Sequence, residues 1–443
     1  MELTPIYIIA SYLLSTDMLQ IDSVSPLMAT HFEGTRRRNE WNNNKRLEFC
    51  LLIAECLIGK REHIDTSLGY YLGTVKDRRK RFGHTTITLN HSKQKTEGFD
   101  FYNKAFNVFQ VNRRAIGYTQ AAAFDFTPSF LKSLNNLFPK IGNFSFIKLF
   151  EWEPHQVPEH DVYTYIEPDL KFIEEELSRT ESSLKNTERW HLFAIYVFAN
   201  KNNGLFPQYY RTNKTERLYT FGCFGLQSIS KAMRNIVFNQ YHCYDMQAAA
   251  YNILLSKVKS EQLHKYPSLL QYASDRQKYR QLIADDTGES VEHIKTALTA
   301  MLFGSDLINS VKSDIPQDIR ENIAKHPLTV AMKNELSDLR QEVCKGRNLN
   351  QNELDKRNDI EKEKRDEATL ANKKRVYWKR HFMVWLYQSH EMKALQAMRS
   401  LTHEQDNCLL LHDGLYTKTD MPVGDFEAII HNETGLSIKI DLE

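Results

Sequence analysis

The sequence feature that most limits the fold is a short hairpin pattern near the carboxyl end, in residues 407–418. Two apolar runs flank Asp413-Gly414, and Asp-Gly between apolar runs is typical of a tight turn that joins two antiparallel strands. The pattern therefore predicts a strand, a turn and a second strand. An ordinary turn needs no chemistry, but His412 and Asp413 at its tip would be polar groups on a rigid mount. Asp413 is either a turn residue or a site residue.

A second aspartate lies at a predicted junction between a strand and a helix. Residues 239–244 read as a strand and residues 247–258 as a helix, so Asp245 falls at the joint. A carboxylate at the end of a strand can bind a divalent cation, but aspartate before a helix is also a common N-cap. If the fold brings Asp245 and Asp413 together, the pair could hold two metal ions for in-line phosphoryl transfer.

A predicted helix between the two aspartates carries a cation and an aromatic ring on one face. Ser290 can cap this helix, which runs to about residue 303, and Gly304 ends it. Lys295, Thr299 and Phe303 are spaced i, i+4, i+8 and share a face. A lysine beside an aromatic ring suits a nucleoside triphosphate, because the cation can hold the phosphates and the ring can stack on the base. An exposed lysine and a core phenylalanine would show the same spacing.

Composition excludes several classes of protein. The chain has 443 residues, 41% hydrophobic and 26% charged, and its 58 Lys and Arg against 56 Asp and Glu give a formal net charge of +2. These values exclude a wholly disordered chain, a collagen-like chain and a disulfide-stapled miniprotein. The cysteines form no C-x-x-C pair, which argues against structural zinc and favours a reducing compartment. The apolar stretch 5–14 is too short to span a bilayer and predicts a buried helix, with no membrane partner.

Two basic clusters stand out against the nearly neutral net charge. Residues 36–46 and 76–81 each carry five basic groups and one acidic group. Such clusters can neutralise phosphates and release counterions from nucleic acid, although a solvated surface is the alternative interpretation. The candidate nucleic-acid contacts in these clusters are Arg36, Arg37, Arg38, Arg78 and Arg79.

The pattern along the chain predicts an α+β fold in four parts. Residues 1–190 are expected to be mostly helical, and residues 191–258 mix strands with helices. Residues 259–380 are expected to be helical, with alternating charges from about 330. Residues 381–443 hold an amphipathic helix, the hairpin, a helix over 425–434 that ends at Gly435, and a last strand over 436–442.

Several short motifs, taken in order, resemble the polymerase domain of the DNA polymerase I family (family A), whose superfamily includes the single-subunit phage-type RNA polymerases. The resemblance covers residues 211–443, about half of the chain, and says nothing about residues 1–190. The matching segments are Thr215–Leu218 (T-G-R-L), Leu226–Ile229 (L-Q-N-I) with Arg234, Asp245 (motif A), Lys295 with Phe303 and Gly304 (motif B), Gln388 with Lys393, Ala397 and Met398 (the Q-G-T-x-A helix), and His412-Asp413 (motif C).

The resemblance implies a right-hand polymerase. A small antiparallel palm sheet would be built from residues 191–258 and 381–443, with helical fingers over 259–380 and an amino-terminal region that could include the thumb. Asp245 and Asp413 would bind two Mg²⁺ ions, with Mn²⁺ as a substitute. The implied partners are a DNA template, a growing strand and nucleoside triphosphates, without a named protein partner. The implied location is the cytoplasm of a bacterial or phage-infected cell, or an organellar matrix.

The resemblance also assigns roles to individual residues. Lys295 would neutralise the triphosphate and protonate the leaving pyrophosphate, and Phe303 would support the new base pair. The other assigned residues are the substrate contacts Thr299, Ala250 and His412 and the nucleic-acid contacts Arg217, Gln227, Arg234 and Gln388.

Three positions near the motifs depart from the family pattern. Val291 stands where an arginine usually precedes the motif B lysine, and Arg280 or Lys278 could take its place. Glu216 replaces the glycine of T-G-R-L, and Phe303 replaces a tyrosine.

Two further departures concern the sugar of the nucleotide. Ala250 stands where DNA polymerases carry a glutamate that blocks a ribose 2′-hydroxyl, and Gly414 also replaces a glutamate. Both favour ribonucleotides, whereas the short spacing from Asp245 to Lys295 resembles the DNA polymerases. The leading hypothesis is a template-directed RNA polymerase or primase. The alternatives are a DNA polymerase of a phage or mobile element, a terminal transferase, a non-catalytic nucleic-acid-binding protein, and an α+β protein whose matches are coincidental.

Overall fold

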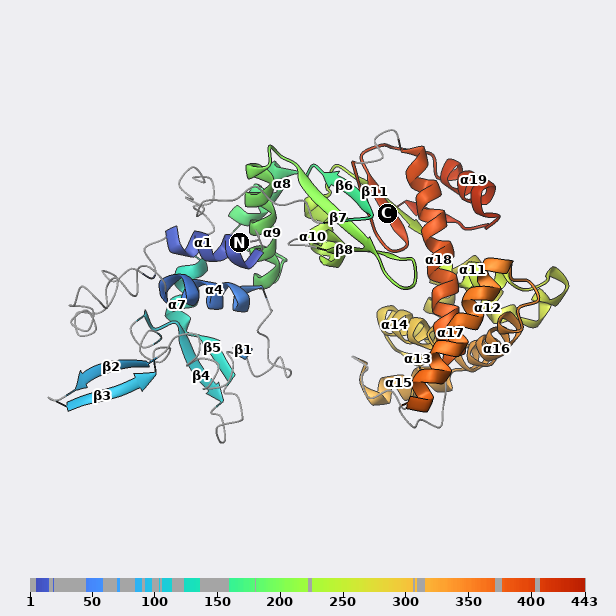
Figure 1. Cartoon of the computed structure of the whole chain (residues 1–443), viewed down its shortest axis with the longest axis horizontal. Helices are drawn as coiled ribbons and strands as arrows, with labels where there is room; N and C mark the ends of the chain where they lie inside the picture. The colour runs from blue at the N-terminus through green and yellow to red at the C-terminus, as the bar shows by residue number, and fades with distance from the viewer. Residues whose placement is uncertain are drawn as a thin grey trace. The chain divides into compact units, whose positions relative to one another are not determined.

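The computed structural model describes residues 5–15, 19, 45–58, 70–71, 84–89, 92–97, 103, 106–113, 123–135, 159–179, 181–221, 225–305, 307–308, 315–370, 377–402 and 407–442 (Figure 1). The chain divides into two compact units. Unit 1 consists of Met1–Glu159, Tyr165–Tyr209 and Phe221–Gln240, and unit 2 of His160–Thr164, Tyr210–Thr220 and Tyr241–Glu443. The described residues form a mixed α+β fold with small sheets.

Unit 1 is built around a buried aromatic helix. Helix α9 packs against α1, α4, α8 and α10, and Phe193 of α9 lies 4.7 Å from Tyr12 of α1, ring centre to ring centre. The helices of this unit are α1 (Pro5–Ser15), α4 (Arg46–Leu57), α7 (Pro128–Asn135), α8 (Leu170–Ser178), α9 (Asn186–Lys201), the 3₁₀ turn η7 (Leu226–Ser228) and α10 (Lys231–Val237). Helix α1 confirms the buried helix expected over residues 5–14, since Ile8, Ile9 and Leu13 are buried.

Strands also occur among the described residues up to 221, and those before residue 190 were not predicted from the sequence. One sheet has the order β1-β5-β4, β2 pairs with β3 as an antiparallel hairpin, and another sheet has the order β6-β7-β8. Their bounds are β1 (Tyr70–Tyr71), β2 (His84–Leu89), β3 (Ser92–Glu97), β4 (Phe109–Arg113), β5 (Ala123–Phe126), β6 (Val162–Ile166), β7 (Phe206–Thr212) and β8 (Leu218–Phe221). The described residues of 1–190 thus contain strands beside the expected helices.

Unit 2 contains an antiparallel sheet with the order β10-β11-β9-β12. The strands are β9 (His242–Met246), β10 (Cys408–Leu410), β11 (Gly414–Thr417) and β12 (Ile440–Leu442). Tyr244 of the central strand β9 is fully buried, and its ring lies 4.6 Å from that of Phe426 on α19 (Val423–Thr434). The hairpin expected around residue 413 is confirmed, as is the helix that ends at Gly435.

Unit 2 also includes parts of β6, β7 and β8, and the other described elements of this unit are helices. They are α11 (Ala249–Ser256), η8 (Ser260–Lys265), α12 (Pro267–Ser274), α13 (Arg276–Thr287), α14 (Val291–Leu302), α15 (Gln317–Lys325), α16 (Pro327–Cys344), α17 (Gln351–Leu370) and α18 (Trp378–Leu401). The long helix α18 packs against β11, α11, α16, α17 and α19, so it links the sheet to the helical part (Figure 1). A single apolar core runs through the sheet and these helices.

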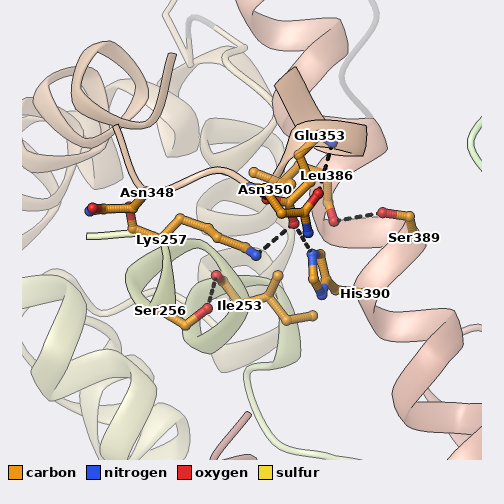
Figure 2. A network of polar contacts seen from close by, with 9 residues as sticks. All are labelled: Ile253, Ser256, Lys257, Asn348, Asn350, Glu353, Leu386, Ser389 and His390. Atoms are coloured by element: carbon orange, nitrogen blue, oxygen red, sulfur yellow. Dashed lines mark hydrogen bonds and ion pairs between the residues drawn. The ribbon is translucent and has the colours of Figure 1, made fainter. Parts of the chain in front are cut away.

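A buried polar network fixes α17 and α18 against α11. Glu353 Oε1 accepts hydrogen bonds from Lys257 Nζ (2.7 Å) and from His390 Nε2 (2.6 Å), and Oε2 accepts one from the Asn350 N–H (2.9 Å; Figure 2). The Glu353 N–H in turn donates to Asn350 Oδ1 (3.0 Å), which makes a capping box at the start of α17. Three segments far apart in the sequence therefore meet at one carboxylate.

Several predicted boundaries differ from those of the structure. Strand β9 ends at Met246 rather than at residue 244, so Asp245 lies inside the strand and not at a joint. The following helix begins at Ala249, after Ala248 adopts a left-handed conformation with φ +46°. The last strand covers only Ile440–Leu442 instead of 436–442. In the described part of the chain, no helix is long and apolar enough to cross a membrane.

Candidate active site

The antiparallel sheet of unit 2 brings the two predicted aspartates together. Asp245 on the central strand β9 is directly opposite Gly414 on β11, the residue that follows Asp413. The Met246 N–H donates a hydrogen bond to the carbonyl oxygen of Asp413 (2.8 Å), which ties the hairpin tip to β9. Because β9 has a partner strand on each side, the backbone at Asp245 has little freedom to move. Asp245 therefore does not serve as a helix N-cap, and the two aspartates are neighbours on rigid backbone.

Gly414 has a steric reason to be glycine. A Cβ at this position would lie 2.8 Å from the carbonyl oxygen of Tyr244, closer than a carbon and an oxygen can approach without displacing the strands. The absence of a side chain thus follows from the close approach of β11 and β9. Gly414 consequently says less about the sugar of a nucleotide than the sequence comparison implied.

The carboxylate of Asp245 is paired with an arginine that sequence analysis did not single out. Arg276 Nη2 lies 2.6 Å from Asp245 Oδ2 and 3.1 Å from Oδ2 of Asp441, the residue opposite Asp245 on β12. Burial by itself would lower the pKa of Arg276, but the hydrogen bond and charge of Asp245 and the charge of Asp441 outweigh it and raise that pKa. The Asp245 side chain keeps 20% of its surface exposed, whereas Asp413 is exposed at the hairpin tip.

A second ion pair borders the two aspartates. Arg217, just before β8, pairs with Glu391 of α18 through its Nε (3.1 Å) and its Nη2, and its guanidinium lies 5.8 Å from the ring centre of Tyr387. Burial, with smaller contributions from the charges of Asp413 and Asp245, raises the pKa of Glu391 to about 8 although Arg217 lowers it. Both aspartates are therefore within electrostatic reach of Glu391.

The turn that precedes Arg217 explains one departure from the T-G-R-L pattern. Glu216 has φ +65°, in the left-handed region that favours glycine. The Asn213 side chain accepts hydrogen bonds from the N–H groups of Thr215 (2.9 Å) and Arg217 (3.0 Å), which closes the turn. The glutamate thus occupies a backbone conformation in which glycine is the usual residue.

His412 lies at the hairpin tip beside an aromatic residue. Its ring centre is 4.9 Å from that of Tyr219 on β8, and burial together with the charge of Arg217 lowers its pKa. Nδ1 of this ring is buried and has no hydrogen-bond partner among the described residues. A neutral imidazole is therefore the form expected at neutral pH.

Helix α14 presents the predicted lysine face to solvent. The Ser290 side chain caps it by accepting the His293 N–H (3.2 Å), and Gly304, at φ +77°, follows its end. Lys295, Thr299 and Phe303 are all exposed, so Phe303 is not a core residue.

The two ends of this face have different neighbours. The ring of Phe303 lies 5.6 Å from that of Tyr387, which connects this end of α14 to the Arg217–Glu391 pair. Lys295 Nζ lies 3.5 Å from a carboxylate oxygen of Glu292. The described contacts of Lys295 do not include either aspartate.

The remaining site candidates are placed as follows. Ala250, in the first turn of α11, is half-buried and packs against the core. Gln388 of α18 is buried, and its amide donates to the hydroxyl of Tyr387 (3.0 Å). Gln227 and Arg234 belong to unit 1, where Arg234 Nη1 donates to the carbonyl oxygen of Ile229 (2.7 Å). Arg36, Arg37, Arg38, Arg78 and Arg79 lie outside the described residues.

The donor set of the site fits magnesium. Carboxylate oxygens are the ligands that Mg²⁺ prefers, and proteins commonly hold it with one or two carboxylates while phosphates and water complete the coordination. Asp245 and Asp413 can supply those two carboxylates. In the part of the chain that the structure describes, no group of three or more His, Cys, Asp or Glu side chains is arranged to hold a metal ion. Substrate phosphates and water would therefore have to complete the coordination.

Sequence reasoning missed Arg276, Asp441 and Glu391. Arg276 is 31 residues from Asp245 and 165 residues from Asp441, so no local pattern connects them. The available signals were a cation within the region expected to be helical and an acidic residue within the expected last strand. No protein-family model matches the chain, and a search of curated proteins gives no match.

Proposed function

We propose that the protein is a template-directed nucleic-acid polymerase, a nucleotidyltransferase of the DNA polymerase I-like superfamily, with palm and fingers in unit 2. The observation that carries the proposal is the pairing of β9 with the 408–417 hairpin, which makes Asp245 and Asp413 neighbours on fixed backbone. The exposed face of α14 and the left-handed backbone of Glu216 support it further. An antiparallel sheet covered by helices would form the palm, and α12 to α17 the fingers.

The proposed chemistry assigns each group a physical task. Asp245 and Asp413 would hold two Mg²⁺ ions, or Mn²⁺ in their place, which supply activation of a 3′-hydroxyl and charge stabilisation on a triphosphate. Lys295 would neutralise the phosphates from the exposed face of α14. Phe303 is exposed and contacts the buried ring of Tyr387, so its ring could support a nucleobase.

The preferred sugar is ribose. Ala250 stands five residues after Asp245, where the DNA polymerases that this chain resembles carry a glutamate. That glutamate excludes a ribose 2′-hydroxyl, and alanine has no carboxylate to do so. Gly414 adds no support, because strand packing already requires glycine there. A DNA polymerase of a phage or mobile element is the alternative, since the spacing of the motifs favours it.

Extension of a labelled primer on a DNA template tests the proposal. NTPs and dNTPs are supplied separately with Mg²⁺, and the wild type is compared with Asp245→Asn, Asp413→Asn and the control Asp366→Asn, an exposed residue of α17. Extension with NTPs that both active-site variants lose and the control retains is the expected result. Extension with dNTPs alone would keep the site and refute the sugar preference. Activity that survives both substitutions would refute the placement of the site.

A further inference from the structure

The strongest unexplained feature near the candidate metal site is the position of Arg276. Its guanidinium bridges two carboxylates, at 2.6 Å from Asp245 Oδ2 and 3.1 Å from Asp441 Oδ2. Only 16% of its side chain is exposed. A bridging guanidinium with two charged acceptors is a strong and directional contact. Arg276 therefore occupies an oxygen of the very carboxylate that the proposed chemistry needs.

Strand register explains why a cation is needed at this point. Asp441 on β12 is directly opposite Asp245 on β9, and like charges directly opposite one another in an antiparallel pair repel. The amide of Gln247 donates to Asp441 Oδ1, which holds this carboxylate in place. The positive charge of Arg276 offsets the repulsion between Asp245 and Asp441.

The local sequence does not account for the position of Arg276. It is the first residue of α13, and the side chain of Asp275 before it caps the helix by accepting the Lys278 N–H (2.9 Å). The helix dipole disfavours a cation in the first turn. The two carboxylates therefore hold Arg276 against the preference of its own helix.

We propose that Arg276 and a divalent cation compete for Asp245, and that Asp441 retains the guanidinium when the cation binds. This inference rests on the proposed function, because it takes Asp245 as a metal ligand. A cation bound to Asp245 would lie close to the positive guanidinium, and the two would repel. Arg276 can remain paired with the carboxylate of Asp441 when a cation occupies Asp245, so it need not leave the site. The nucleotide-free protein would then bind metal weakly, and a triphosphate would bring the charge that favours the exchange.

Binding of Mn²⁺ without nucleotide, measured by loss of the free-ion electron paramagnetic resonance signal, tests the competition. We expect Arg276→Gln to bind Mn²⁺ about tenfold more tightly than the wild type, within the usual range of coupling between two ligands. Arg365→Gln, which removes an exposed arginine paired with Glu361 on α17, is the matched control and should bind as the wild type does. The gain should disappear in the double variant Arg276→Gln/Asp245→Asn.

A second variant separates competition from direct metal binding by Asp441. Asp441→Asn should weaken Mn²⁺ binding, because Asp245 is then the only charged partner that Arg276 has among the described residues. In the Arg276→Gln background the same substitution should have no effect, whereas a metal ligand at 441 would still show the weakening. If Arg276→Gln alone proves too unstable, the double variant Arg276→Gln/Asp441→Asn can still be measured. It removes one of the two carboxylate charges, those of Asp245 and Asp441, that repel each other.

The outcomes distinguish the two proposals. Mn²⁺ binding that depends on Asp245 but is unchanged or weaker in Arg276→Gln would overturn the competition and leave the metal site standing. Mn²⁺ binding that does not depend on Asp245 in any variant would overturn the metal site and the competition together. Circular dichroism melting of each variant checks that the proteins compared are folded.

Discussion

Unit 2 contains two clusters of charged side chains that differ in how completely their charges are paired. Around Glu353, both carboxylate oxygens accept hydrogen bonds, and the carboxylate is only 4% exposed. Around Asp245 and Asp413 the carboxylates are more open, with Asp413 exposed at a hairpin tip. Both clusters bring side chains together from distant parts of the chain.

The difference indicates what each cluster is for. A buried carboxylate with every oxygen satisfied holds segments together, because removing any partner leaves an uncompensated polar group. An open carboxylate pair on rigid strands adds little to stability and leaves lone pairs for a ligand. The Glu353 cluster is therefore structural, whereas the Asp245 cluster is the candidate for chemistry.

The largest expected effect separates activity from stability. Under the proposed function, Asp413→Asn should lower primer extension by about 10³-fold or more, because it would remove a charge that positions the metal ions. The free energy of unfolding should change by less than about 1 kcal/mol, since the side chain is exposed. Steady-state extension and urea unfolding of one preparation measure both quantities. A large loss of stability would contradict the conclusion that the Asp245 and Asp413 carboxylates add little to stability.

The opposite result is expected at Glu353. Glu353→Ala should destabilise the protein by about 3 kcal/mol, because it leaves the largely buried ammonium of Lys257 and the ring of His390 without their acceptor. Urea unfolding measures the change. Glu361→Gln, which weakens the more exposed ion pairs of Glu361 with Arg365 and Arg357, should cost at most about 1 kcal/mol. Equal effects of the two substitutions would contradict a structural role for the Glu353 cluster.

A third substitution tests how strand packing holds Asp413 in position. Gly414→Ala should cost about 1–3 kcal/mol, because its Cβ would lie 2.8 Å from the Tyr244 carbonyl oxygen and force β11 away from β9. It should also reduce extension, since Asp413 would move with the hairpin. Gly424→Ala, at a position with nothing within 4 Å of the added carbon, is the control and should be neutral or slightly stabilising. Thermal melting and extension assays report both effects.

The smallest effect is a dependence of stability on pH. Burial by itself would raise the pKa of Glu353, but hydrogen bonds from His390 and Lys257 outweigh it and lower that pKa to about 2, from an ordinary value of 4.5. A depressed pKa contributes stability above the unfolded value, and this stability is lost as the pH falls from about 4.5 towards 2.

The pH effect is measured by a comparison with a neutral variant. The stability difference between the wild type and Glu353→Gln should be full at pH 6 and smaller at pH 3. Urea unfolding at the two pH values gives this difference, and Glu361→Gln, at a less buried carboxylate, serves as the control. A difference that grows on acidification would contradict the assignment.

Local signals predicted the elements that carry most of the candidate site. The hairpin at Asp413-Gly414 and the helix between Ser290 and Gly304 were found because turn and cap preferences act over a few residues. The end of β9 was misplaced because two neighbouring strands extend it past Asp245. Strand pairing is set by distant partners, which a local pattern does not contain.

The sequence alone determined which residue types stand at the turn, at the caps and on the face of α14 that carries Lys295, because these depend on neighbours within one or two turns. It also determined the α+β class. Only the tertiary structure decided that Asp245 lies beside the Asp413 hairpin, that Arg276 bridges Asp245 and Asp441, and that Glu353 gathers three helices. These contacts join residues far apart in the chain, and their existence depends on strand register and helix packing, which form only when the whole core is buried.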